Sequence, residues 1–218
     1  MMNIRRFACN MLEENCYVVS DDTGDCVVID CGAYFDNERA AIVNYIRDNQ
    51  LNPVHLLVTH GHLDHNFGNN TIYDEFGLKP EASEMDDNLM RALGRQAEVM
   101  YSMRLNYDFP EVGKHLTANE TITFGTHKLR VLTTPGHSRG SICFVCDAEK
   151  VVFTGDTLFR MSVGRTDFEG GSTQQIIDSL HRLAELPDDM VVLPGHGPQS
   201  TIGDEKKFNP YMRMGRSM

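Results

Sequence analysis

The sequence predicts an α/β sandwich formed by a single domain over residues 1–218. Short apolar segments typical of strands alternate with segments of helical periodicity in both halves of the chain, which is the pattern of strands and helices packed in layers. No stretch rich in proline, glycine or serine interrupts it, and no internal repeat is detectable. A chain of 218 residues with 41% apolar residues can bury a substantial core without disulfides.

The first half predicts a hairpin, a helix and a buried strand. The hairpin strands cover residues 16–19 and 26–30, around a turn rich in aspartate. Apolar residues at helical spacing predict a helix over 36–50, which must stop before Pro53. A strand over 54–58 follows, and polar side chains gather directly where it ends.

Residues 81–105 repeat apolar side chains every three or four positions, which predicts a long helix. Several of these side chains are methionines, among them Met85, Met90, Met100 and Met103. Methionines at this spacing are typical of a helix that packs against the core. The alternative is that the helix forms an adaptable wall of a substrate pocket.

The second half predicts a helix over 173–186 and strands over 129–132, 141–146, 151–154 and 190–193. Cys143 and Cys146 form a C-x-x-C inside one of these strands. A spacing of three sends their side chains to opposite faces of the sheet. They cannot share a metal there, and we expect them to be buried structural thiols.

The formal net charge of −11 argues against a nucleic-acid partner, because phosphate binding relies on clustered lysine and arginine. No window approaches the roughly 18 consecutive apolar residues that a membrane span needs. Arg5 and Arg6 are not followed by the apolar stretch of a signal peptide. The sequence therefore predicts a cytoplasmic protein that binds neither nucleic acid nor membrane, and it leaves the oligomeric state open.

Metal-capable side chains follow four of the predicted strands. Because loops leave an α/β sheet together at the carboxyl ends of its strands, we expect these side chains to meet at one edge. Glycines at positions 61, 136, 155 and 195 stand beside them and permit tight turns. The seven candidates are His60, His62, Asp64, His65, His137, Asp156 and His196.

Seven ligands exceed the need of a single ion. A catalytic zinc keeps only three protein ligands beside an open position, so seven fit two ions that share a carboxylate. Such ions lie roughly 3.5–4 Å apart and can hold a bridging hydroxide. We expect two divalent ions, with zinc favoured and iron or manganese also compatible.

The other polar candidates carry weaker signals. Asp30 either orients the metal centre as an outer carboxylate or caps a buried turn. The remaining histidines lack a comparable setting and are expected to be structural; they are His55, His115, His127 and His181.

HGHLDH at residues 60–65 is an H-x-H-x-D-H signature, and in it the chain resembles the metallo-β-lactamase superfamily. The resemblance implies a four-layer αββα sandwich with the metals at one edge. It places one ion between His60, His62 and His137, the other between Asp64, His65 and His196, and Asp156 as the bridge. Asp64 and Asp156 are also the residues for which it implies catalytic roles.

Longer motifs are similar to those of the hydroxyacylglutathione hydrolases, the glyoxalase II group, and in particular to its short bacterial branch. These motifs are TPGHSRGS at 134–141, FTGDTLF at 153–159, GRTDF at 164–168 and PGHGP at 194–198. The resemblance implies a small-molecule thioester as substrate. The C-terminal helical domain with which longer members hold glutathione is not expected here.

Two substrate-binding positions differ from that group, since Arg165 and Phe168 stand where its members have lysine and tyrosine. We expect both to contact the substrate. The guanidinium of Arg165 could hold a carboxylate through two hydrogen bonds. The tyrosine hydroxyl is lost, so recognition of glutathione is not implied by these positions alone.

The chemistry implied is hydrolysis of a thioester. Water held between two cations would lose a proton near neutral pH, and the resulting hydroxide would attack the acyl carbonyl. The leaving group is a thiolate, which needs no strong general acid because the pKa of a thiol is about 8.5. One alternative is a sulfur dioxygenase acting on a persulfide, with a single iron held by His60, His137 and Asp156. A second is a non-catalytic metal-binding module, which would be expected to lack ligands.

Overall fold

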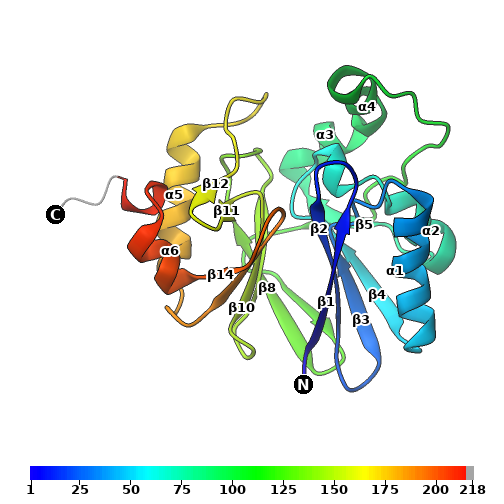
Figure 1. The fold of residues 1–218 in the computed structure, drawn as a ribbon, viewed down its shortest axis with the longest axis horizontal. Helices are drawn as coiled ribbons and strands as arrows, with labels where there is room; N and C mark the ends of the chain where they lie inside the picture. The colour runs from blue at the N-terminus through cyan, green and yellow to red at the C-terminus, as the bar shows by residue number, and fades with distance from the viewer. Residues whose placement is uncertain (215–218) are drawn as a thin grey trace.

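Figure 1 shows the computed structural model of the protein, which describes residues 1–214. Two β-sheets face each other, and helices cover their outer faces, with α1 and α2 on one side and α5 and α6 on the other. The predicted four-layer αββα sandwich is thereby confirmed.

The first sheet contains six strands in the order β1-β2-β3-β4-β5-β6. β1 to β3 pair in antiparallel fashion and β3 to β6 pair in parallel, so the carboxyl ends of β3, β4 and β5 share one edge. The strands are β1 (Asn3–Cys9), β2 (Glu14–Ser20), β3 (Asp25–Ile29), β4 (Asn52–Leu57), β5 (Pro80–Ser83) and β6 (Lys114–Leu116). Its helices are α1 (Asp36–Asp48) and α2 (Asn69–Phe76), with a 3-10 turn η1 (Leu63–His65) between β4 and α2.

The second sheet has the order β14-β13-β10-β9-β8-β7. Its strands are β7 (Thr121–Phe124), β8 (His127–Thr133), β9 (Ile142–Cys146), β10 (Val151–Gly155), β13 (Val191–Pro194) and β14 (Ser200–Thr201). A small two-stranded ribbon, β11 (Leu158–Phe159) with β12 (Ser162–Val163), follows the carboxyl end of β10. The helices are α5 (Thr173–Leu183), α6 (Ile202–Phe208) and the 3-10 turn η3 (Tyr211–Arg213).

The single helix predicted over residues 81–105 is wrong. The segment begins as β5, which pairs in parallel with β4, and continues as three short helical pieces, η2 (Glu84–Asp86), α3 (Asp87–Arg91) and α4 (Leu93–Tyr101). The side chain of Ser83 accepts a hydrogen bond from the Met85 backbone N–H and starts the first piece. At the start of the segment, pairing with the edge of β4 thus outweighs the helical periodicity of the sequence.

Both readings of the methionines in this segment hold in part. Met90 is buried in the core beneath α3 and α4, whereas Met85 is exposed. Met100 is partly exposed and faces the cavity described below.

The main core lies between the two sheets and contains β-branched and aromatic residues from both, including Val27, Ile29, Phe144 and Phe153. A second core lies between the second sheet and α5, and a third between the first sheet and the pair α1 and α2. Cys146 lies in the inter-sheet core and Cys143 in the core beneath α5, so the predicted opposite orientation of these thiols is confirmed.

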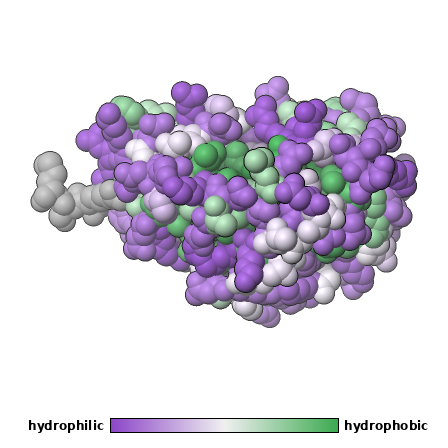
Figure 2. Space-filling view, turned by 90° about the horizontal axis from the view of Figure 1, so that it is seen from below, coloured by the Kyte–Doolittle hydropathy of each residue, from purple (hydrophilic) through white to green (hydrophobic). Residues whose placement is uncertain are grey.

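Seen from below, the molecule presents a largely hydrophilic face with hydrophobic groups showing between the polar ones (Figure 2). Within residues 1–214, no helix combines the length and the apolar character that crossing a bilayer requires.

Candidate metal centre

Four strand ends deliver the predicted ligands to one edge of the sandwich. β4 leads into the loop with His60, His62, Asp64 and His65, which η1 turns back toward the sheet. In the second sheet, β8, β10 and β13 lead to the remaining three, which are His137, Asp156 and His196. The structure therefore brings all seven predicted ligands together, from both sheets.

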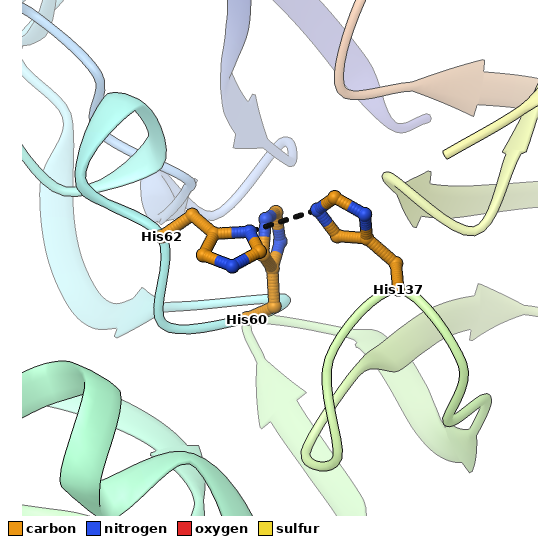
Figure 3. A group of neighbouring side chains, drawn as sticks. All are labelled: His60, His62 and His137. Carbon is orange, nitrogen blue, oxygen red and sulfur yellow. Dashed lines mark hydrogen bonds between the residues drawn. The ribbon is translucent and has the colours of Figure 1, made fainter. Parts of the chain in front are cut away.

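The seven side chains fall into two groups of three and a shared carboxylate. We call His60, His62 and His137 the first triad, and Asp64, His65 and His196 the second triad; in each, the ligand atoms lie within 4.8 Å of one another. Figure 3 shows how the rings of the first triad converge from two loops, with Nδ1 of His62 lying 2.8 Å from Nε2 of His137.

Asp156 lies between the two triads. Its Oδ1 is 3.2 Å from Nε2 of His65, and its Oδ2 is 3.5 Å from Nε2 of His137 and 3.7 Å from Nε2 of His196. One carboxylate therefore reaches ligand atoms of both triads, as a bridging ligand must.

Unpartnered buried atoms show that this arrangement fits cations. Among the described residues, Nε2 of His60, Nε2 of His65 and Oδ1 of Asp156 are buried without a hydrogen-bond partner. Buried polar atoms are normally satisfied, and leaving one unpaired costs about 1–3 kcal/mol. Nitrogen and carboxylate oxygen are also the donors that divalent transition metals take.

The outer nitrogens of the histidines are held so that the inner ones face the centre. Nδ1 of His137 donates to the backbone oxygen of Arg165 at 2.7 Å, and Nδ1 of His196 donates to that of Leu12 at 3.0 Å. Such contacts fix the tautomer and the ring orientation and leave Nε2 free as a ligand.

Of the two roles that the sequence left open for Asp30, the contacts support the orientation of the metal centre. Its Oδ2 lies 3.0 Å from Nδ1 of His65, and the same carboxylate accepts hydrogen bonds from the backbone N–H and the hydroxyl of Thr59, each at 2.7 Å. Asp30 itself adopts a left-handed conformation with φ of 50°. It thus orients a histidine of the second triad and also ties the end of β3 to the loop after β4.

Burial and charge set the protonation states in two different ways. Burial, reinforced by neighbouring histidines, holds the pKa of His60 well below its usual range, and burial lowers the pKa of His62 to about 4. Burial opposes the charge on His65 as well, but the carboxylates of Asp156, Asp30 and Asp64 outweigh it and raise the pKa of His65. At neutral pH, His60 and His62 are therefore neutral and ready to act as ligands.

The centre opens into a cavity of about 340 Å³. The apolar part of its lining is Leu12, Met100, Tyr101, Phe159 and Phe168. A larger cavity of about 620 Å³ lies between α3, α4 and residues 107–115 and contains none of the seven ligands, so the smaller one is the candidate substrate site. Leu12 was not predicted to line a pocket, because an isolated apolar residue belongs to no motif. Tyr101 lies in the segment 81–105, for which a pocket wall was one of the two predictions, and Phe159 ends the FTGDTLF motif.

Arg165 and Phe168, the two residues expected to contact the substrate, both line this cavity. The ring of Phe168 is 5.2 Å from that of His62, and the guanidinium of Arg165 stacks 4.0 Å above the Phe168 ring. The guanidinium also donates to both carboxylate oxygens of Asp167, each at 2.7 Å. Arg165, the arginine found among the described residues of the cavity lining, is therefore already paired.

The four histidines expected to be structural lie outside the groups of possible metal ligands found among the described residues. His55 contacts Glu81, His115 contacts Asp87, His127 lies between Asp21 and Glu149, and His181 contacts the backbone of Met214.

Residues 10–196 match the family model of the metallo-beta-lactamase superfamily. The chain belongs to this superfamily. The curated protein "Hydroxyacylglutathione hydrolase GloC" of Haemophilus influenzae is 33% identical to it, over 97% of this chain and 98% of that one.

Two solved structures are similar along nearly their whole length. One, described as the BLEG-1 B3 metallo-beta-lactamase, has a TM-score of 0.87 and 29% identity, covering 97% of this chain and 100% of that chain. The other, TTHA1623 in a di-iron-bound form, has a TM-score of 0.84 and 31% identity, covering 95% and 100%. Together with the histidine and aspartate groups, these matches support a metallo-hydrolase with divalent metals.

Proposed function

We propose that the protein hydrolyses thioesters of small acylated thiols, with two divalent ions held by the two triads and Asp156. The observation that carries this proposal is the pair of complete triads that face one shared carboxylate at the base of a cavity. The similarity to a hydroxyacylglutathione hydrolase supports the thioester as substrate class. Zinc is the metal we expect, and iron or manganese would also suit these ligands.

The protein's own side chains bind and orient the reacting groups. Divalent ions at this centre would supply a hydroxide near neutral pH and polarise the acyl carbonyl. Leu12, Met100 and Phe159 offer apolar surface for the acyl or thiol chain. Asp64 and Asp156 line the same cavity, so a chain bound there would lie beside both carboxylates.

Among the described residues that line this cavity, those not assigned as metal ligands include no obvious proton donor, which favours a thioester over an amide. Tyr101 lines the cavity, but burial, more than any other effect, raises the pKa of its hydroxyl well above the ordinary value. A thiolate leaves without a strong acid because the pKa of a thiol is about 8.5. An amine leaving group would need protonation, for which the cavity lining offers no neutral donor of suitable pKa.

The decisive experiment assays S-lactoylglutathione and a series of simpler acyl thioesters and measures the metal content of the same sample. We expect turnover of at least one thioester by protein that carries about two metals per chain. One iron per chain together with oxygen uptake on a persulfide would instead identify the dioxygenase alternative, in which His60, His137 and Asp156 hold the iron. Full loading with two metals but no turnover of any thioester would favour a non-catalytic module.

A further inference from the structure

The buried carboxylate of Asp86 connects the two loops that carry the first triad. Asp86 ends η2 and is 1% exposed. Its Oδ2 accepts hydrogen bonds from the backbone N–H of Gly61 at 2.9 Å and from the hydroxyl of Ser138 at 2.6 Å, and its Oδ1 accepts one from the N–H of Gly140 at 2.7 Å. Gly61 stands between two ligands of the first triad, and Ser138 follows the third.

Gln96, in α4, hydrogen-bonds to the loop after β4, which carries His60 and His62. This side chain is 8% exposed, and its oxygen accepts a hydrogen bond from the N–H of Leu63 at 2.9 Å. Its amide group donates to the backbone oxygens of Gly61 and Leu89, each at 2.9 Å. The loop that carries His60 and His62 is thus fixed by an acceptor and a donor from one side chain.

The contact between these loops and the helical segment leaves no spare room. A Cβ atom on Gly140 would lie 2.6 Å from Cγ of Asp86, and a Cβ atom on Gly61 would lie 2.6 Å from Cβ of Leu89. Any shift of the segment would therefore move the loops. Because Nδ1 of His62 and Nε2 of His137 stand only 2.8 Å apart, such a shift directly changes the spacing of ligand atoms.

The second triad is held by other groups. Asp30 contacts His65, and the backbone oxygen of Leu12 accepts from His196. Neither of these contacts involves Asp86 or Gln96.

Asp30 also reaches the first triad, because the Thr59 hydroxyl that donates to it lies 3.1 Å from Nδ1 of His60. Asp30 is therefore shared by the two triads, whereas the three hydrogen bonds of Asp86 all go to the loops of the first triad.

We propose that Asp86 and Gln96 are positioning residues for the first triad, so that the segment from 84 to 101 sets the metal affinity of that triad separately from the second one. Groups that orient ligands from outside typically change metal affinity by roughly 10- to 100-fold when they are removed. This inference concerns metal retention and does not depend on which substrate is hydrolysed.

Asp86→Asn tests the inference because the amide keeps the size of the side chain but presents a donor to groups that themselves donate. Protein loaded with zinc is dialysed against a graded series of a chelator, and the zinc retained per chain is measured. We expect one of the two zinc ions to be lost at roughly 10- to 100-fold lower chelator concentration than in the wild type, with the other retained as in the wild type. Asp87→Asn is the matched control, since the neighbouring carboxylate contacts Arg91 and His115 and not the loops.

Gln96→Glu provides a second measurement. Its carboxylate can still accept from Leu63 but cannot donate to Gly61, and we expect weaker zinc retention at the first triad here too. Retention equal to the wild type in both variants would overturn the proposal, as would loss of both ions together at one chelator concentration. If Asp86→Asn does not fold, Ser138→Ala decides: it removes a single donor to Asp86, and unchanged zinc retention in that variant would count against the proposal.

Discussion

Asp156 is the side chain on which both triads depend, since its two oxygens face different histidines. Asp156→Ala should therefore reduce the metal content to less than one ion per chain. Thioester turnover should fall by more than about 100-fold, because losing a ligand costs more than losing a group that only orients a ligand from outside. Elemental analysis and the turnover assay on one sample would measure both. Asp189→Ala, at an exposed aspartate paired with Lys150, is the control, and unchanged metal content in Asp156→Ala would contradict the bridging position.

Arg165 offers a second prediction at the scale of a residue, because its guanidinium is already paired with Asp167. Asp167→Asn should free it for an anionic substrate and lower the KM for S-lactoylglutathione by about two- to fivefold, the range expected for an exposed ion pair. The kcat should stay within about twofold of the wild-type value, since neither side chain contacts the ligand atoms that face the metals. A thioester without a carboxylate is the control substrate, and an equal fall in its KM would show that charge is not the cause.

The carboxyl end of β10 approaches the loop after β4 so closely that only glycine fits there. Gly155 has φ of +47°, and a Cβ atom on it would lie 2.3 Å from the hydroxyl oxygen of Thr59, which holds Asp30. Gly155→Ala should lower the free energy of unfolding by about 2–4 kcal/mol, through backbone strain and overpacking together. Urea unfolding of the metal-loaded protein would measure this loss.

Gly77 is the matched control for that substitution. It ends α2 with φ of +73°, and nothing lies within 4 Å of its missing Cβ atom, so Gly77→Ala adds strain without a clash. A loss of about 1 kcal/mol is expected there. Equal losses in the two variants would show that the close approach to Thr59 has no energetic weight.

The elements that the sequence predicts well are those with a strong local pattern. α1 and α5 show helical periodicity and clear stops, and β3, β4 and β10 each contain a short segment rich in apolar residues. β1 was not predicted, because its residues are largely exposed and it is a strand only through its pairing with β2. β5 was misread for the same kind of reason, since its partner β4 is distant in sequence.

In the metal centre too, residues with a local sequence pattern could be predicted and residues without one could not. Its seven ligands could be predicted because each histidine or aspartate follows a predicted strand and stands near a glycine, which together form a recognisable pattern. The groups that hold those ligands could not, since the backbone oxygens of Leu12 and Arg165 carry no sequence signal. Asp86 was likewise hidden, as one acid among many in a chain with 31 aspartate and glutamate residues.

At the scale of the whole molecule, the two sheets are joined at both ends. At one end the metal centre takes ligands from both sheets. At the other end of β2, Asp21 in the turn between β2 and β3 contacts the hairpin of β7 and β8. The carboxylate of Asp21 accepts hydrogen bonds from the N–H and the hydroxyl of Thr126 at 2.6 and 2.9 Å, and it lies 3.2 Å from Nδ1 of His127. These contacts join the two sheets at the end away from the metal centre.

This junction predicts how stability changes with pH. Burial would raise the pKa of Asp21, but hydrogen bonds from Thr23, Thr126 and His127 outweigh it and hold the pKa well below its ordinary value of 3.8. The ionised carboxylate therefore contributes stability that is fully present above about pH 4 and is lost as the pH falls toward the folded-state pKa. Asp21→Asn should lower the free energy of unfolding at pH 7 by about 2–3 kcal/mol, as expected for buried hydrogen bonds to a charged group.

Chemical unfolding of the wild type and of Asp21→Asn at several pH values between 3 and 7 would measure the effect. The difference between them is expected to be constant from pH 7 to about pH 5 and to shrink below pH 4, because both proteins keep the same metal ligands and only one carries the carboxylate. Asp22→Asn is the control, since that exposed side chain pairs with the N-terminal amino group. This substitution should change stability little at any pH. A wild-type advantage that persisted undiminished at the lowest pH would show that the size of the side chain, and not its charge, joins the two sheets.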